Sequence, residues 1–212
     1  MKSLARIISY VFHPLLFPTY GTLLILASNP NRFGYFGDKV HIVWLIIVFA
    51  LTFVFPSVWL FMMKRLEMIN SLKLETAKER IVPFIAAGTF YLWTAWMFKP
   101  NVNMKIPSNE FIFYLMLGSC ISIFTALLIN IFSKVSLHAV GAGNFVGLTL
   151  VLVGLSTYDL RFLLMAVILL AGIIGASRLV LKVHTTTEVF TGYAVGFIAQ
   201  FIVFSILPRF SN

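Results

Sequence analysis

Residue types that can bind an anion and move protons gather in three short polar segments of an otherwise apolar chain. The segments read Lys73-x6-Arg80, Ser136-Leu137-His138 and Ser177-Arg178-x5-His184-x3-Glu188. Guanidinium groups bind phosphate or carboxylate through paired hydrogen bonds, and lysine supplies a compact positive charge. Histidine changes its charge near neutral pH and therefore accepts or donates protons readily. The three segments together favour chemistry on a negatively charged group.

Long apolar stretches must position these segments. Apolar residues make up 60% of the 212 residues and charged residues only 11%, whereas a soluble domain carries about a quarter charged residues. A membrane-spanning helix needs ~20 consecutive apolar residues. Uncharged apolar stretches run at about 7–31, 42–63, 81–98, 111–133, 139–158, 162–177 and 189–208. The sequence predicts an all-α, polytopic transmembrane bundle of about seven spans, with six as the alternative, in a single membrane domain (residues 1–212).

The first stretch is irregular, because His13, Pro14 and Pro18 interrupt it. Proline removes a backbone donor and breaks or kinks a helix. This stretch is therefore either a kinked span or an interfacial helix that leads into a short span.

The predicted order of spans places the polar segments on one membrane face. Two spans separate the first segment from the second, and two more separate the second from the third. An even number of crossings returns the chain to the same side. The motif loops at 73–83, 135–138 and 177–188 are therefore expected to meet at a single interface.

The spacing of these residues resembles the signature of the type-2 phosphatidic acid phosphatase superfamily, KxxxxxxRP, PSGH and SRxxxxxHxxxD. The resemblance covers residues 73 to 188 and preserves the order of the three motifs. There are departures: Arg80 is not followed directly by proline, and Val135 and Leu137 stand where the signature has proline and glycine. Glu188 replaces the aspartate.

The resemblance implies a metal-independent lipid phosphatase that needs no cofactor. His184 would attack phosphorus and form a phosphohistidine, with Glu188 fixing the tautomer of its ring. His138 would protonate the leaving alcohol and then activate water. The remaining motif residues would bind the substrate phosphate: Lys73, Arg80, Ser136, Ser177 and Arg178.

Some of these residues also have ordinary structural interpretations. Thr185-x-x-Glu188 before an apolar run is typical of a helix capping box, and this role is compatible with a contact to His184. Gly141, Gly143 and Gly147 favour close helix packing over a phosphate cradle. His13 and His41 are expected to be ordinary polar residues whose hydrogen bonds are satisfied locally, without a functional role.

The leading hypothesis is hydrolysis of a phosphate or pyrophosphate ester of a lipid. The alternative is a membrane protein or transporter that binds a lipid headgroup without catalysis, and a degenerate, inactive family member is a third possibility. The net charge of +9 lies mainly in loops beside spans, so membrane lipids and not nucleic acid are the expected partners. The resemblance implies the bacterial cytoplasmic membrane with the site on its outer face. The count of basic residues on the two faces favours a cytoplasmic site. If Lys73, Arg80 and Arg178 are left out of the count as phosphate ligands, neither orientation is favoured.

Overall fold

The structure, a computed structural model of the full chain, describes all residues except 29–38, 70, 72–75, 101–106 and 207–212. The described residues form helices and no strands, which confirms the predicted all-α fold. In chain order the elements are α1 (Lys2–Val11), η1 (Pro14–Leu16), α2 (Phe17–Ser28), α4 (Lys39–Phe49), η2 (Ala50–Val54), α5 (Phe55–Arg65), α6 (Ala77–Met97), α7 (Pro107–Phe132), α8 (Leu137–Leu155), α9 (Arg161–Val180) and α10 (Thr186–Ile206).

Six helical rods in the described part of the chain are long and apolar enough to cross a membrane, which makes this a multi-pass membrane protein. They are Lys2–Ser28, Lys39–Arg65, Asn109–Phe132, Leu137–Leu155, Arg161–Val180 and Thr186–Ser205. The count therefore matches the alternative of six. The stretch predicted at 81–98 lies in α6, which is 21 residues long and packs against α7 but is not one of these six.

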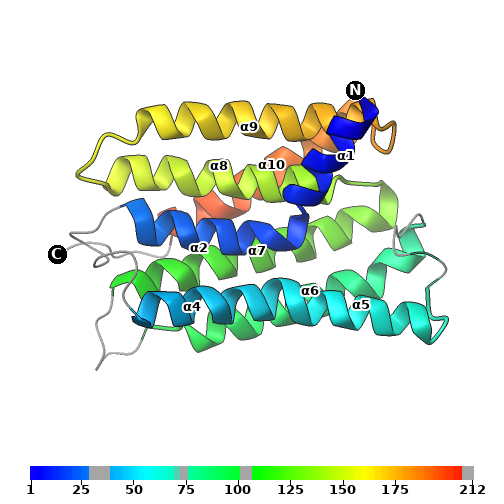
Figure 1. Cartoon of the computed structure of the whole chain (residues 1–212), viewed down its shortest axis with the longest axis horizontal. Helices are drawn as coiled ribbons and strands as arrows, with labels where there is room; N and C mark the ends of the chain where they lie inside the picture. The colour runs from blue at the N-terminus through cyan, green and yellow to red at the C-terminus, as the bar shows by residue number, and fades with distance from the viewer. Residues whose placement is uncertain (29–38, 70, 72–75, 101–106, 207–212) are drawn as a thin grey trace.

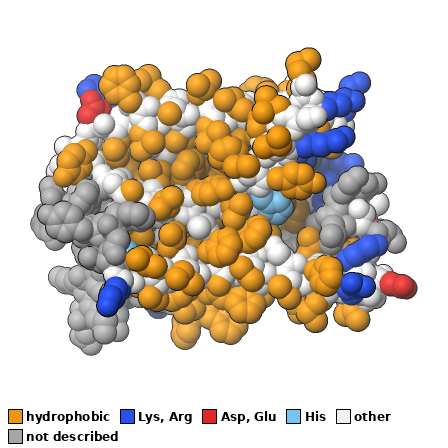
Figure 2. All heavy atoms as spheres, in the orientation of Figure 1, with side chains coloured by type: hydrophobic (Ala, Val, Ile, Leu, Met, Phe, Trp, Pro, Cys, Tyr) orange, Lys and Arg blue, Asp and Glu red, His pale blue; other side chains and the backbone are white. Residues whose placement is uncertain are grey.

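The outer surface of the bundle is apolar along most of its length. Large side chains that point outward include Trp96, Phe162, Leu169 and Phe190, which are exposed by 72%, 78%, 67% and 71%. Figure 2 shows apolar side chains covering the middle of the visible face, with basic side chains mainly toward the ends. Exposing so much apolar surface to water is unfavourable, and lipid removes that cost.

Two proline-containing breaks shape the first two rods. The chain leaves helical geometry at Phe12 and His13, and Pro14 starts the short 3₁₀ helix η1, so that α1 lies at an angle to α2 (Figure 1). In the second rod the π-helical turn η2 ends at Val54, two residues before Pro56. Proline lacks the N–H for a regular α-helical bond, and a π turn is a common accommodation within a helix.

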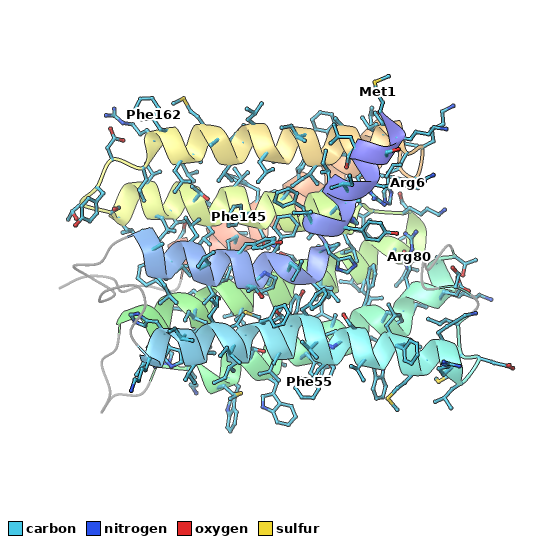
Figure 3. All side chains as sticks on the ribbon, viewed as in Figure 1. Met1, Arg6, Phe55, Arg80, Phe145 and Phe162 are labelled. Carbon is cyan, nitrogen blue, oxygen red and sulfur yellow. The ribbon has the colours of Figure 1, made fainter. Side chains whose placement is uncertain are left out.

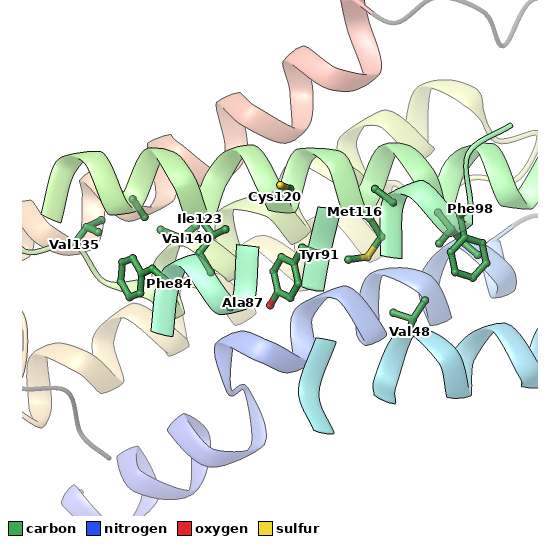
Figure 4. Close-up of a cluster of buried hydrophobic side chains, with 13 residues drawn as sticks. Val48, Phe84, Ala87, Tyr91, Phe98, Met116, Cys120, Ile123, Val135 and Val140 are labelled. Carbon is green, nitrogen blue, oxygen red and sulfur yellow. The ribbon is translucent and has the colours of Figure 1, made fainter. Parts of the chain in front are cut away.

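The largest part of the core lies between α6 and α7. Phe84 and Tyr91 of α6 pack with Met116, Cys120 and Ile123 of α7, and all five are buried (Figure 4). The cluster also takes in Val135, which precedes α8, and Val140, which lies in the first turn of that helix. Burial in this cluster therefore couples the α6–α7 pair to the segment that carries His138.

Helices α8 and α10 cross closely because both lack side chains at the contact. A Cβ atom on Gly196 would collide with the carbonyl oxygen of Val140, and one on Gly192 would lie 2.7 Å from the carbonyl oxygen of Ser136. From α8, a Cβ on Gly143 would collide with the carbonyl oxygen of Tyr193. Small residues allow two backbones to approach in this way. The interpretation of the α8 glycines as packing residues thus agrees with the structure.

The ends of the helices place all three motif segments together. Figure 1 shows the N-terminal ends of α6, α8 and α10 and the C-terminal end of α9 at the same end of the bundle. Arg80 lies at this end together with Met1 and Arg6, while Phe162 marks the opposite end (Figure 3). Helices α6 and α7 both run between the two ends of the bundle, so two helical rods separate the first segment from the second, although α6 is not among the six counted spans.

We expect Gly196→Ala to destabilise the protein by about 1–3 kcal/mol, because the added methyl group meets the backbone of α8 and forces the helices apart. Gly172→Ala is the matched control, since no atom lies within 4 Å of the position of its Cβ. It should be neutral or stabilise helix α9 by up to about 1 kcal/mol. Thermal unfolding in detergent measures both. Equal effects of the two substitutions would show that the close crossing is unimportant.

Candidate active site

The turn between α9 and α10 brings His184 back toward Arg178. The amide of Val183 donates to the carbonyl oxygen of Arg178 over 3.3 Å, and Lys182 adopts a left-handed conformation with φ of 55°. This conformation reverses the chain directly after the helix end. The five residues between Arg178 and His184 thus complete the last turn of α9 and reverse the direction of the chain.

His184 and Glu188 form a close pair at the start of α10. The Nδ1 atom of His184 lies 2.7 Å from Oε2 of Glu188, and only 8% and 18% of the two side chains are exposed. A carboxylate accepts a hydrogen bond, so Nδ1 carries the proton and the lone pair of neutral histidine lies on Nε2. Nε2 makes no hydrogen bond within the described part of the chain. It is therefore the nitrogen able to act as a nucleophile.

Glu188 also caps helix α10. Its Oε2 atom accepts from the amide of Thr185 over 3.4 Å, and its own amide donates to Oγ1 of Thr185 over 3.3 Å. These reciprocal bonds are a capping box. Both roles that the sequence suggested for Glu188 are thus present in the geometry, and the cap holds the carboxylate within reach of His184.

The environment of His184 favours its neutral form. Burial lowers the pKa of the imidazole below its usual 6.5, and the hydrogen bond to Glu188 acts in the opposite direction. The nearby Arg178 and Arg80 guanidinium groups lower this pKa further. A neutral imidazole is the form that attacks an electrophile, so the site holds His184 ready for that role at neutral pH.

His138 lies in the first turn of α8, on the other side of the close crossing. The amide of Ser136, which precedes α8, donates to the carbonyl oxygen of Glu188 over 3.2 Å and ties the second motif to the third. Nε2 of His138 lies 3.0 Å from the carbonyl oxygen of Ser9, so Nε2 is the protonated nitrogen. His138 is close enough to Arg178 and His184 to interact electrostatically with both.

The two arginines contribute differently. Arg178 lies in the last turn of α9, and its Nη1 donates to the hydroxyl of Ser9 over 2.8 Å. Its Nε atom is buried and has no hydrogen-bond partner. Arg80, in the first turn of α6, is half-buried and interacts electrostatically with Glu188 and His184. Both positive charges thus lie beside the His184–Glu188 pair.

The two motif serines are bonded within their own helices. Ser136 is fully buried, and its hydroxyl oxygen accepts from the amide of Ala139 over 3.5 Å as the N-cap of α8. The hydroxyl of Ser177 donates to the carbonyl oxygen of Ile174 over 2.6 Å. Lys73, the remaining predicted phosphate ligand, lies outside the described residues.

Two residues of the N-terminal segment contact residues of the site, which the sequence did not predict. Ser9 contacts both His138 and Arg178, and the ring of His13 lies edge-on to that of His138 with centroids 6.1 Å apart. His13 also accepts from the amide of Leu15 over 3.4 Å and packs edge-on against Phe53, which agrees with the expectation of an ordinary polar residue. The signal in the sequence was a serine and a histidine four residues apart in an otherwise apolar stretch. His41 is buried and packs against Trp44, in α4.

Asn130 holds the first motif segment in place. Its side-chain Nδ2 donates to the carbonyl oxygen of Ala77 over 2.9 Å, from the end of α7 to the first residue of α6. Thr76 and Glu79 cap the same helix end reciprocally. These bonds fix the turn that carries Arg80.

No protein-family model, no curated protein and no solved structure matches the chain. Among the described residues, no group of three or more His, Cys, Asp or Glu side chains is arranged to hold a metal ion.

Glu188→Gln separates the two roles of this residue. Glutamine keeps an oxygen for the cap, so the free energy of unfolding should change by no more than about 1 kcal/mol. Turnover should fall by roughly 10²-fold or more, because the charge that orients His184 is lost. The acidic limb of kcat/KM, which lies below pH 6.5, should move to lower pH, since Glu188 raises the pKa of His184. Full activity with an unmoved pH profile would leave Glu188 as a cap alone.

Arg178→Lys should lose most of the activity, because an ammonium group cannot form the paired hydrogen bonds of a guanidinium. Lys182→Asn is the matched control in the same turn. It removes a charge, and asparagine tolerates the left-handed conformation of this position. Its activity should stay close to that of the unmodified protein. Equal losses in the two variants would mean that Arg178 acts only as a general positive charge.

Proposed function

We infer that the chain is an integral-membrane phosphatase of the type-2 phosphatidic acid phosphatase superfamily, acting on a phosphate or pyrophosphate ester of a lipid. The observation that carries this proposal is the His184–Glu188 pair, 2.7 Å apart, beside Arg178 and Arg80 at one end of an apolar bundle. The pair supplies an oriented neutral imidazole, and the arginines supply the positive charge that a phosphate group requires.

In the proposed first step Nε2 of His184 attacks phosphorus. The N–P bond forms as the P–O bond to the lipid breaks. Beside the anionic phosphate of the substrate, His138 carries protons on both ring nitrogens, and it becomes neutral when the proton on Nε2 passes to the departing oxygen. Glu188 stabilises the positive charge that develops on His184. The products of this step are a lipid alcohol and a phosphohistidine.

In the second step water attacks the phosphohistidine. His138, now neutral and unprotonated at Nε2, takes a proton from that water, the N–P bond breaks, and phosphate leaves. The net reaction is ester plus water to alcohol plus phosphate. Arg178 and Arg80 hold the phosphoryl oxygens throughout.

The position of the site supports a lipid as the substrate. His184 and Glu188 lie where α10 begins, directly beyond apolar spans, and α1 beside them exposes apolar side chains. A lipid can place its phosphate at this level while its tails remain in the membrane. We place the site on the outer face of the bacterial cytoplasmic membrane, as the resemblance implies.

Purified protein in detergent should release phosphate from at least one member of a panel of lipid phosphates, and the release should persist in EDTA. The physical reason is that arginines and histidines provide the positive charge and the proton transfers of the proposed steps. His184→Ala is the control for contaminating phosphatases. Loss of activity in EDTA with recovery in Mg²⁺ contradicts the mechanism. Binding of the lipids without turnover would favour the headgroup-binding alternative.

A further inference from the structure

Helix α1 lies across the candidate site and occupies two of its hydrogen-bonding groups. The contacts come from one residue, Ser9, which is only 9% exposed. Its carbonyl oxygen faces Nε2 of His138, and its hydroxyl oxygen accepts from Nη1 of Arg178. The amphipathic helix thus turns its small, buried face, Ala5 and Ser9, toward the protein.

Both oxygen atoms of Ser9 act as hydrogen-bond acceptors here. The hydroxyl proton is used within α1, where it is donated to the carbonyl oxygen of Ala5 over 2.8 Å, so only lone pairs remain for Arg178. The carbonyl belongs to the last turn of α1, where carbonyl groups lack partners inside the helix. The C-terminal end of a helix also carries a partial negative charge. In acceptor chemistry and in sign of charge, this end of α1 resembles a phosphate group.

The groups that Ser9 occupies are those that the proposed reaction requires. The single proton on Nε2 of His138 cannot be held by Ser9 and passed to a leaving alcohol at the same time. The hydrogen-bonding groups of Arg178 are only partly satisfied, because its buried Nε has no hydrogen-bond partner. A phosphate would bind the guanidinium through paired hydrogen bonds between opposite charges, whereas the Ser9 hydroxyl offers a single neutral acceptor.

We propose that α1 is a lid whose Ser9 takes the place of phosphate oxygens in the resting protein, and that the substrate displaces it. The inference rests on the proposed phosphatase function. The lid keeps Arg178 and His138 occupied until a phosphorylated lipid competes for them.

The structure gives the lid a hinge and a place to move. Phe12 and His13 form a non-helical link between α1 and η1, and Tyr20 holds the hinge by donating to the carbonyl oxygen of Val11 over 2.6 Å. The outward face of α1 exposes Leu4, Ile7, Tyr10 and Val11 by 63%, 58%, 77% and 48%. A helix with such a face and basic residues lies stably in the membrane interface. Displaced from the site, α1 can remain there without exposing apolar surface to water.

A thiol on the buried face of α1 reports the movement. Ala5→Cys, which leaves Ser9 intact, is made in a Cys120→Ala background so that it provides the single cysteine. Ala5 is 4% exposed, so the thiol should react slowly with an impermeant maleimide. Orthovanadate, a phosphate mimic, should raise the reaction rate severalfold and saturably. Tyr10→Cys, on the outward face of the same helix, is the control and should react rapidly with and without vanadate.

Kinetics of Ser9→Ala test the same inference independently. Without the hydroxyl, α1 competes less well with substrate, so KM should fall severalfold while kcat is unchanged or higher. Ser3→Ala, an exposed serine of α1, serves as control. A large fall in kcat for Ser9→Ala would instead make Ser9 a positioning residue of the working site and overturn the lid.

The outcomes distinguish the lid from the phosphatase itself. Vanadate that inhibits phosphate release and accelerates labelling of Ala5→Cys supports the lid. Inhibition with unchanged or slower labelling overturns the lid and leaves the phosphatase intact. A protein that releases no phosphate from any lipid phosphate contradicts the proposed function, and the lid with it.

Discussion

The close crossing of α8 and α10 is the contact on which the candidate site depends. His138 begins one helix and His184 precedes the other, so their separation is set by how near the two backbones come. Glycines on both helices allow contact with the opposite backbone, and the amide of Ser136 then reaches the carbonyl oxygen of Glu188. A larger side chain at this crossing would separate the second motif from the third. Helix packing in the apolar interior is therefore also what determines the geometry at the polar end.

The electrostatics of that end follow from partial burial. Arg178, Arg80 and His184 are each removed in part from water, which strengthens their interactions and disfavours a further positive charge on the imidazole. Glu188 balances this tendency, and its capping bonds keep it from turning away. The buried Nε of Arg178 is left without a partner, a cost that binding of an anion would remove. The site therefore has an unfilled donor that a further acceptor can satisfy.

The N-terminal segment links this polar end to the membrane surface. Ser9 and His13 reach into the site from a helix whose other face is apolar and exposed. The break at His13 and Pro14 makes this possible, because it allows α1 to lie at an angle to α2 (Figure 1). The same feature that makes the first apolar stretch look irregular therefore brings α1 across the site.

Local patterns in the sequence determined the helices and the contacts within them. Long apolar stretches predicted the spans, Thr185-x-x-Glu188 predicted the cap, and the spacing of His184 and Glu188 placed them one helical turn apart. These features depend on hydrogen bonds and contacts between residues about four positions apart, which a sequence displays directly. Only the tertiary structure decided that Ser9 and His13 join His138 and Arg178, from more than 120 residues away in the chain. Such contacts depend on the angle at which one helix crosses the end of others, and that angle is set by packing among distant segments.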